Sequence, residues 1–125
     1  MIDNNLIKGY LAEQVAAKKL LTLDFEVSRP IVDTFGYDFI CYKNCRSIKI
    51  QVKSLASPDS NNGYKFRLDR EIYTNIDYFL LYLSDIDIWY ILPINNMDTL
   101  HIMLYNESIN SKYNIYKEAW NLLEV

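Results

Sequence analysis

The chain has 125 residues, a length typical of a single domain over 1–125, and half of them are apolar, which is enough for a sizeable core. Glycine and proline number only three each, which argues against a low-complexity or linker-like chain. The net charge of −3 argues weakly against nucleic-acid binding, and no apolar run is long enough for a membrane-spanning helix. Residues 1–5 lack signal-peptide character and the two cysteines form no disulfide framework, so a reducing, cytoplasmic setting fits best.

The first predicted element is an amphipathic helix that begins after an Asp or Asn cap at positions 3–5 and ends near Leu23. At 100° per residue, one apolar arc about 100° wide contains Leu6, Tyr10, Ala17, Leu20 and Leu21. Lys8, Ala12 and Lys19 lie opposite this arc. Glu13 falls inside it, where a carboxylate is costly unless it is paired or binds a cation. On the helix pattern alone, an edge position paired with a lysine such as Lys53 is the simpler interpretation of Glu13.

Residues 25–29 predict a first strand that ends at Pro30, and residues 31–36 predict a loop. Two strands follow, at 37–42 and 48–53, and a two-residue turn at Asn44-Cys45 is predicted to join them. That turn pairs Lys43 with Arg46, and the antiparallel register then places Asp38 directly opposite Gln51. Side-chain alternation puts Gln51 and Lys53 on the face opposite to Ile48, Ile50 and Val52. The hairpin therefore predicts that Asp38, Gln51 and Lys53 converge at its open end.

The rest of the chain predicts a sheet and a final helix. Residues 55–63 are rich in turn formers, and residues 64–68 alternate, with Lys65 and Arg67 on one face. Apolar runs at 77–83 and 88–92 predict strands, the first of them buried on both faces. Residues 100–105 are compatible with a helix or a strand, and residues 115–123 predict a helix. The order α-β-β-β-β-β-α indicates an α+β or mixed α/β protein.

Charge is unevenly distributed along the chain. Residues 43–70 contain seven basic and two acidic residues, a local charge of +5 that leaves −8 on the rest. Such asymmetry is typical of an anion-binding face, although solvated strand lysines explain it about as well. The candidate DNA-binding residues are Lys43, Arg46, Lys49, Ser54, Lys65, Arg67 and Arg70. For Ser54, an ordinary residue at a strand end is an equally good interpretation.

Glu13, Asp38, Gln51 and Lys53 together have the composition of a phosphodiester-hydrolysing site. Mg²⁺ prefers one or two carboxylates, waters and substrate phosphate, so Asp38 is the expected main ligand. Gln51 can supply a neutral oxygen or position a water, and Glu13 can lie near the metal or orient a metal-bound water. Lys53 can stabilise charge on the attacked phosphate or help to deprotonate the attacking water.

These motifs resemble the PD-(D/E)xK nuclease superfamily, whose core is α-β-β-β-α-β with a central mixed sheet flanked by helices. The matching segments are Lys8-Gly9-x-x-x-Glu13, Gly36-Tyr37-Asp38 and Gln51-Val52-Lys53. The Gln-x-Lys form is most similar to homing endonucleases associated with group I introns. Further segments that support this branch are Arg29-Pro30, Tyr64-Lys65-Phe66-Arg67 and Trp89-Tyr90-Ile91-Leu92-Pro93. The resemblance implies that the main-chain carbonyl of Val52 also contacts the metal.

The resemblance implies an Mg²⁺-dependent DNA endonuclease, with Mn²⁺ as a possible substitute, that acts as a homodimer or tetramer on double-stranded DNA. Two departures from the family pattern weaken this expectation: Gln51 replaces the usual acid, and no proline precedes Asp38. Two alternatives stay open. One is a nuclease similar to Holliday-junction resolvases that reads branched DNA by its shape. The other is a catalytically inactive DNA-binding or interaction module of the same fold, which Gln51 and the acidic total charge favour.

Overall fold

The computed structural model describes residues 4–32, 36–59, 62–68, 75–96, 101–106 and 111–124. The long elements are the helix α1 (Asn4–Thr22) and the strands β2 (Phe39–Lys43), β3 (Arg46–Leu55), β5 (Tyr78–Leu83) and β6 (Ile88–Pro93). Shorter strands are β1 (Glu26–Ser28), β4 (Tyr64–Arg67) and β7 (His101–Leu104). Three 3-10 helices complete the description: η2 (Ile94–Asn96), η3 (Asn114–Tyr116) and η4 (Trp120–Glu124).

A five-stranded mixed sheet has the order β1-β2-β3-β5-β6, and β4 pairs with β7 in a separate two-stranded sheet. β3 and β5 run parallel, whereas the other pairs in the large sheet are antiparallel. This arrangement confirms the predicted α+β class with a central mixed sheet. α1 is the one α-helix within the described residues, and β4 lies between β3 and β5 in the sequence.

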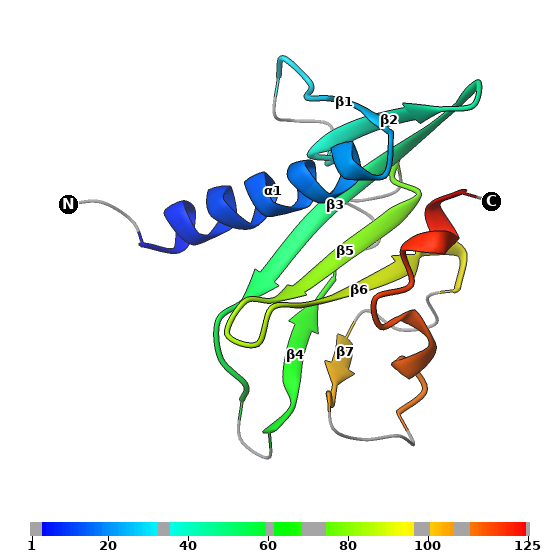
Figure 1. Cartoon of the computed structure of the whole chain (residues 1–125). Coiled ribbons are helices and arrows are strands. Elements are labelled where there is room, and N and C mark those ends of the chain that lie inside the picture. The colour runs from blue at the N-terminus through cyan, green and yellow to red at the C-terminus, as the bar shows by residue number, and fades with distance from the viewer. Residues whose placement is uncertain are drawn as a thin grey trace.

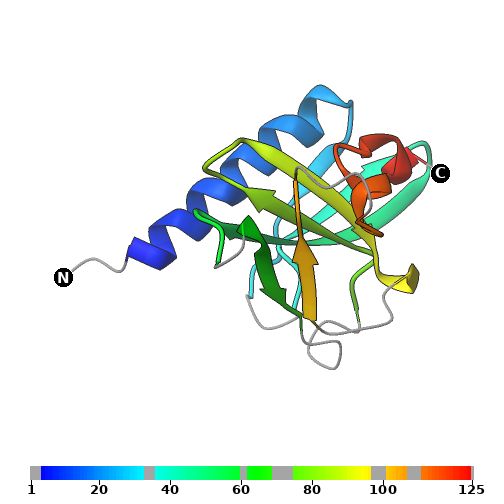
Figure 2. The same ribbon diagram turned by 90° about the horizontal axis from the view of Figure 1, so that it is seen from below.

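The large sheet lies between two apolar cores. Figures 1 and 2 show α1 on one face of the sheet and the pair β4–β7 on the other. Ile50 and Val52 of β3 pack with Leu80 of β5 in the core beneath α1. Phe79 and Leu81, which alternate with Leu80, enter the second core with residues of β4 and β7. β5 is buried at every position because both of its faces are covered, as its continuous apolar run predicted.

The predicted β2–β3 hairpin is confirmed, including its register. The five paired positions run from Lys43↔Arg46 at the turn to Phe39↔Ile50 at the open end. Asn44 and Cys45 have φ of 54° and 63°, the left-handed values that a two-residue type I′ turn requires. Because this turn matches the natural twist of the strands, the open end of the hairpin is set by local sequence.

The prediction of the buried stripe on α1 is confirmed for Leu20 and wrong for Leu6, Tyr10 and Leu21, and Ala17 is only partly buried against the core. The buried side chains are Ala12, Ala16 and Leu20, whereas Leu6 and Tyr10 are 73% and 58% exposed. The sheet selects the small residues because alanine lets the helix approach the strands closely. Ala12 was expected on the outer side of the helix and instead lies against the sheet. One apolar side of α1 therefore faces away from the sheet.

The predicted final helix is also wrong as a continuous element. Residues 115–123 contain parts of η3 and η4, separated by Glu118 in the left-handed region at φ 51°. The Glu118 N–H donates to the Trp89 carbonyl at 2.7 Å, and Lys117 forms a β-bridge with Tyr90. Pairing with the edge strand β6 thus interrupts the helix. The ambiguous segment at 100–105 contains the strand β7.

Within the described residues, no helix is long and apolar enough to cross a membrane.

Candidate active site

Asp38 lies at the open end of the hairpin, immediately before β2. Its N–H donates to the Ile50 carbonyl at 2.8 Å, and its carboxylate oxygen Oδ2 accepts the Val52 N–H at 2.7 Å. In a regular ladder, a main-chain carbonyl would accept the Val52 N–H. The carboxylate takes that role where β2 ends, and it is thereby held against the strand that carries Gln51-Val52-Lys53. The predicted proximity of Asp38 to this motif is present.

Lys49, Gln51 and Lys53 occupy alternate positions of β3 and are all half-buried. Gln51 and Lys53 pair with Phe79 and Leu81 of β5, so they point to the face opposite to α1. The Lys49 ammonium lies 5.2 Å from the centre of the Tyr37 ring, next to Asp38 in the chain. One face of β3 therefore presents two cations and an amide beside the Asp38 carboxylate.

Glu13 approaches from α1, on the other face of the sheet. Its carboxylate forms an ion pair with Arg29 at 2.8 Å, and 24% of its side chain is exposed. The Arg29 guanidinium lies 4.8 Å from the centre of the Phe39 ring. Extending the β1–β2 register by one residue places Arg29 opposite Phe39, which explains this contact. Arg29 thus connects Glu13 to the strand residue that follows Asp38.

The donors at this end of the hairpin fit a hard divalent cation. Asp38 supplies a carboxylate and Gln51 an amide oxygen, and both are ligand types that Mg²⁺ accepts. The N–H and C=O of a strand residue point to the same side, so the Val52 carbonyl faces the side on which its N–H meets Asp38. In the part of the chain that the structure describes, no three His, Cys, Asp or Glu side chains gather. A metal ion held by these donors would therefore have few carboxylate ligands, in keeping with Gln51 at the position of an acid.

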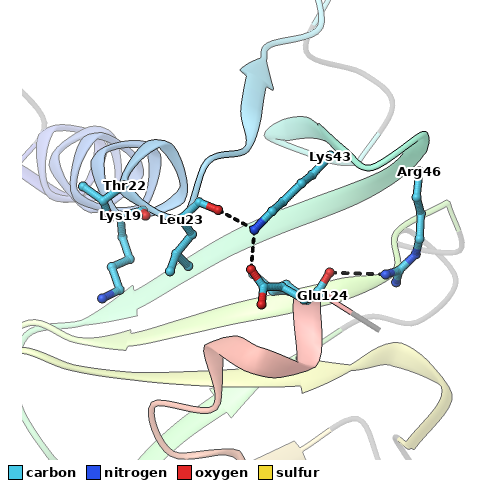
Figure 3. Close-up of polar contacts among 7 residues, drawn as sticks. Lys19, Thr22, Leu23, Lys43, Arg46 and Glu124 are labelled. Atoms are coloured by element: carbon cyan, nitrogen blue, oxygen red, sulfur yellow. Dashed lines mark hydrogen bonds and ion pairs between the residues drawn. The ribbon is translucent and has the colours of Figure 1, made fainter.

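Lys43 and Arg46, predicted to contact DNA, make contacts within the protein (Figure 3). The Lys43 ammonium donates to the Leu23 carbonyl at 2.7 Å and forms an ion pair with Glu124. Arg46 donates to the Leu123 carbonyl at 3.3 Å. These contacts join the hairpin turn to the end of α1 and to η4. The turn lies about 16 Å from Asp38, at 3.3 Å per strand residue.

The other candidate DNA contacts lie in different places. Lys65 and Arg67 are exposed on β4, where they alternate with the buried Tyr64 and Phe66 as predicted. Ser54 is half-buried at an even position of β3, on the face opposite to Lys53. Arg70 lies outside the described residues. Among the predicted basic residues, Lys49 thus lies on the same strand and the same face as Gln51 and Lys53.

Sequence reasoning gave no role to two residues that touch the site's elements. From the sequence, Arg29 is only part of the Arg29-Pro30 segment that resembles the family, because its ion pair with Glu13 depends on the packing of α1 against β1. Asp77 accepts the Lys49 N–H at 2.8 Å through Oδ2, and its own N–H donates to the Lys49 carbonyl at 2.8 Å. A helix carboxylate inside an apolar arc is a signal for a cationic partner, but it does not identify Arg29.

An α-helix on a mixed sheet, with an aspartate at the end of one strand and a Gln-x-Lys motif on the next, defines a restriction-endonuclease-like fold. The sequence profile of the PD-(D/E)XK endonuclease family matches residues 4–123. The chain belongs to this family, whose members are nucleases that use divalent metal ions.

Solved structures show the same fold. The structure of a bacterial homing endonuclease, I-Ssp6803I, superposes with a TM-score of 0.86 at 23% identity and covers 98% of this chain and 92% of its own. The Holliday junction resolvase Hjc from Archaeoglobus fulgidus, an archaeal hyperthermophile, superposes with a TM-score of 0.55 at 15% identity. That match covers 79% of this chain and 84% of the resolvase. A search of curated protein sequences gives no match.

Proposed function

We propose that residues 1–125 form one Mg²⁺-dependent endonuclease domain of the homing or mobile-element type, which hydrolyses phosphodiester bonds in double-stranded DNA. The hydrogen bond from the Val52 N–H to Asp38 carries the proposal, because it holds a carboxylate against the Gln-x-Lys strand. The fold shared with a bacterial homing endonuclease over 98% of the chain supports this assignment over other nuclease types.

Asp38, the Gln51 side-chain oxygen and the Val52 carbonyl are the proposed metal-holding groups, and Glu13 is proposed to orient water from the helix side. A bound Mg²⁺, or Mn²⁺ in its place, polarises the phosphate and makes hydroxide available near neutral pH. Asp38 keeps one oxygen committed to the Val52 N–H, so its orientation is fixed before any ligand binds. Pre-set donors of this kind avoid reorganisation during the reaction.

Lys53 is proposed to act on the attacked phosphate. It follows Gln51 by two residues, so both side chains leave β3 on the same face about 6.6 Å apart along the strand. An ammonium at this position stabilises the charge that develops on the phosphate oxygens or assists deprotonation of the attacking water. Lys49 lies on the same face of β3, two residues before Gln51. It is the proposed contact for a neighbouring phosphate, together with Lys65 and Arg67 on β4.

Two alternatives have specific support. Hjc, a Holliday junction resolvase, shares the fold over 79% of this chain, which favours branched DNA as a second candidate substrate. Gln51 in place of an acid removes one negative charge from the proposed metal site, which favours a DNA-binding module without catalysis. Each alternative predicts a different result in one assay.

The test is cleavage of supercoiled plasmid, branched DNA and a randomised duplex library, with Mg²⁺ or Mn²⁺ against an EDTA control. Wild-type protein is compared with Asp38→Ala and Lys53→Ala. Metal-dependent cutting that both substitutions abolish supports the proposed site, and the preferred substrate separates homing from junction resolution. Folded wild-type protein that binds DNA but cuts none of these substrates contradicts the proposal and supports the inactive module.

A further inference from the structure

The small sheet formed by β4 and β7 has one buried face and one that points outward. Its buried face belongs to the second core and consists of Tyr64, Phe66, Ile102 and Leu104. The alternate positions form the other face, which we call the outer ribbon face: Lys65, Arg67, His101 and Met103. The antiparallel register places Arg67 directly opposite His101, and Lys65 directly opposite Met103.

The outer ribbon face is basic, although the chain as a whole has a net charge of −3. Lys65, Arg67 and His101 are exposed, and the four residues that define this face include no carboxylate. Met103 is half-buried, and its sulfur lies 2.5 Å from the position that a Cβ atom on Gly63 would take, so its side chain lies beside Gly63. A basic surface on an acidic protein favours a polyanion over a protein partner.

The ribbon lies on the same side of the large sheet as the proposed site. Figures 1 and 2 show β4 and β7 on the face opposite to α1, and Gln51 and Lys53 point to that face as well. The ribbon packs on residues of β5 and β6, and the side chains of Gln51 and Lys53 on β3 stay half-buried. A duplex on this side of the sheet can therefore reach both the β3 motif and the outer ribbon face.

The dimensions of the ribbon fit the major groove of B-form DNA. Paired strands lie about 4.8 Å apart, and a major groove about 12 Å wide admits a two-stranded ribbon, whereas a minor groove about 6 Å wide does not. Along β4, Lys65 and Arg67 are about 6.6 Å apart, which is close to two base-pair steps of about 3.4 Å. Duplex RNA fits poorly, because its major groove is deep and too narrow for side chains to read.

The ribbon is also anchored firmly to the rest of the fold. The Tyr64 hydroxyl donates to Oδ2 of Asp85 at 2.8 Å, which ties β4 to the turn between β5 and β6. Together with the buried side chains of the second core, this contact fixes the outer ribbon face relative to the large sheet. Recognition residues on anchored strands are placed more precisely than residues on loops.

We propose that the outer ribbon face reads base edges in the major groove of duplex DNA, with Arg67 and His101 as the sequence-specific pair. The proposal rests on the proposed function for its partner. An arginine donates two parallel hydrogen bonds to O6 and N7 of guanine. The His101 imidazole, with its Cβ about 5 Å away across the ribbon, supplies a donor or an acceptor for the same or the adjacent base pair. Lys65 stays a phosphate contact, which contributes affinity without sequence preference.

The test is the selection of bound duplexes from a randomised library, followed by sequencing, in EDTA so that cleavage plays no part. Wild-type protein is expected to enrich a motif. Arg67→Ala is expected to erase the preference at one or two base pairs of that motif and to weaken binding to it about 10- to 100-fold. His101→Ala is expected to erase the preference at the same or the adjacent pair, with a smaller loss of affinity.

Lys65→Ala is the matched control, because Lys65 is a cation on the same strand and the same face. Its loss is expected to weaken binding to all sequences alike and to leave the motif unchanged. Methylation of guanine N7 in the selected duplex reports on the groove, since this atom lies in the major groove. It is expected to block binding by wild type and to matter less for Arg67→Ala. Thermal unfolding checks that each variant is folded.

Wild-type protein that enriches no motif would overturn the inference, as would folded Arg67→Ala and His101→Ala variants that both enrich the wild-type motif. Unhindered binding to the N7-methylated motif would overturn it as well. Protein that enriches a motif read by Arg67 but cuts no DNA with Mg²⁺ or Mn²⁺ would contradict the proposed function and support the ribbon as a reader. Protein that cuts plasmid while both ribbon variants keep the motif would support the proposed function and overturn the ribbon.

Discussion

Oδ2 of Asp38 accepts the Val52 main-chain N–H at 2.7 Å, so a side chain completes the sheet at the point where β2 ends. The contact serves the fold and the proposed site together. It satisfies a strand donor that would otherwise lose its partner, and it aims a carboxylate at the Gln-x-Lys motif. Predictions about this residue must therefore separate stability from activity.

Asp38→Asn is expected to keep the hydrogen bond through its amide oxygen and to lower cleavage at least about 100-fold, since a neutral amide holds a divalent cation less strongly. Asp38→Ala is expected to lose both cleavage and about 1–3 kcal/mol of unfolding free energy, because the Val52 N–H loses its acceptor. Asp77→Asn is a matched control, since Asp77 also accepts a β3 N–H, that of Lys49, at 2.8 Å. Cleavage rates and urea unfolding measure the two effects, and equal activity in Asp38→Asn and wild type would contradict the assignment.

Gln51→Glu is expected to increase metal affinity, because it adds the negative charge that the family pattern usually has. The metal concentration for half-maximal cleavage is expected to fall about tenfold, which corresponds to about 1.4 kcal/mol. Titration of Mn²⁺ followed by calorimetry checks binding independently of turnover. Weaker metal binding by the glutamate variant would mean that Gln51 does not face the cation.

Arg29→Gln is expected to change the metal dependence more than the stability. The Glu13–Arg29 pair is partly exposed, and such pairs contribute about 0–1 kcal/mol. Removing the cation releases Glu13 and lowers the local positive charge, so Mn²⁺ binding is expected to tighten a few-fold. Arg29→Lys keeps the charge and is expected to resemble wild type. A large loss of stability with unchanged Mn²⁺ affinity would instead make the pair a structural contact alone.

Lys43→Ala and Lys65→Ala are expected to have opposite effects. Lys43 joins the end of α1 to η4 through Leu23 and Glu124, so its loss is expected to cost about 1–3 kcal/mol of unfolding free energy with little change in DNA affinity. Lys65 is exposed on β4, so its loss is expected to spare stability and to reduce the salt dependence of DNA binding by about one unit of slope. Denaturation and salt-dependent binding curves distinguish the two. If Lys43→Ala weakened DNA binding without lowering the free energy of unfolding, Lys43 would be a DNA contact after all.

Two buried tyrosines are expected to make the fold sensitive to alkali. Burial, followed by a hydrogen bond to Asp85, raises the pKa of Tyr64 to about 12. Burial, followed by a hydrogen bond to Asp87, raises the pKa of Tyr82 to about 12 as well. Because an unfolded tyrosine has a pKa near 10, their contribution to stability is complete below pH 10 and is lost as the pH rises towards 12. Thermal unfolding between pH 9 and 12 checks this, and Tyr64→Phe is expected to flatten the decline. A melting temperature that stays constant up to pH 12 would contradict it.

Local sequence was sufficient for the hairpin and for the core of the site. Asn44-Cys45 sets a tight turn, the turn sets the register of β2 and β3, and the register brings Asp38 to Gln51-Val52-Lys53. The period of two also places Lys49 on the face of Gln51 and Lys53. These relationships depend on residues within about fifteen positions of each other, where strand geometry leaves few alternatives.

Tertiary packing decided which side of α1 is buried and which partners the charged residues find. A helix with apolar residues on more than one side has no unique inward face. In the structure, the side that carries the alanines packs against the sheet, because small side chains let the helix lie close to the strands. Glu13 pairs with Arg29, and Lys43 contacts Leu23 and Glu124, across sequence separations of 16 to 81 residues. Periodicity can show that a charged side chain lies on a buried face and needs a partner. Which residue is that partner depends on how elements distant in the sequence pack together.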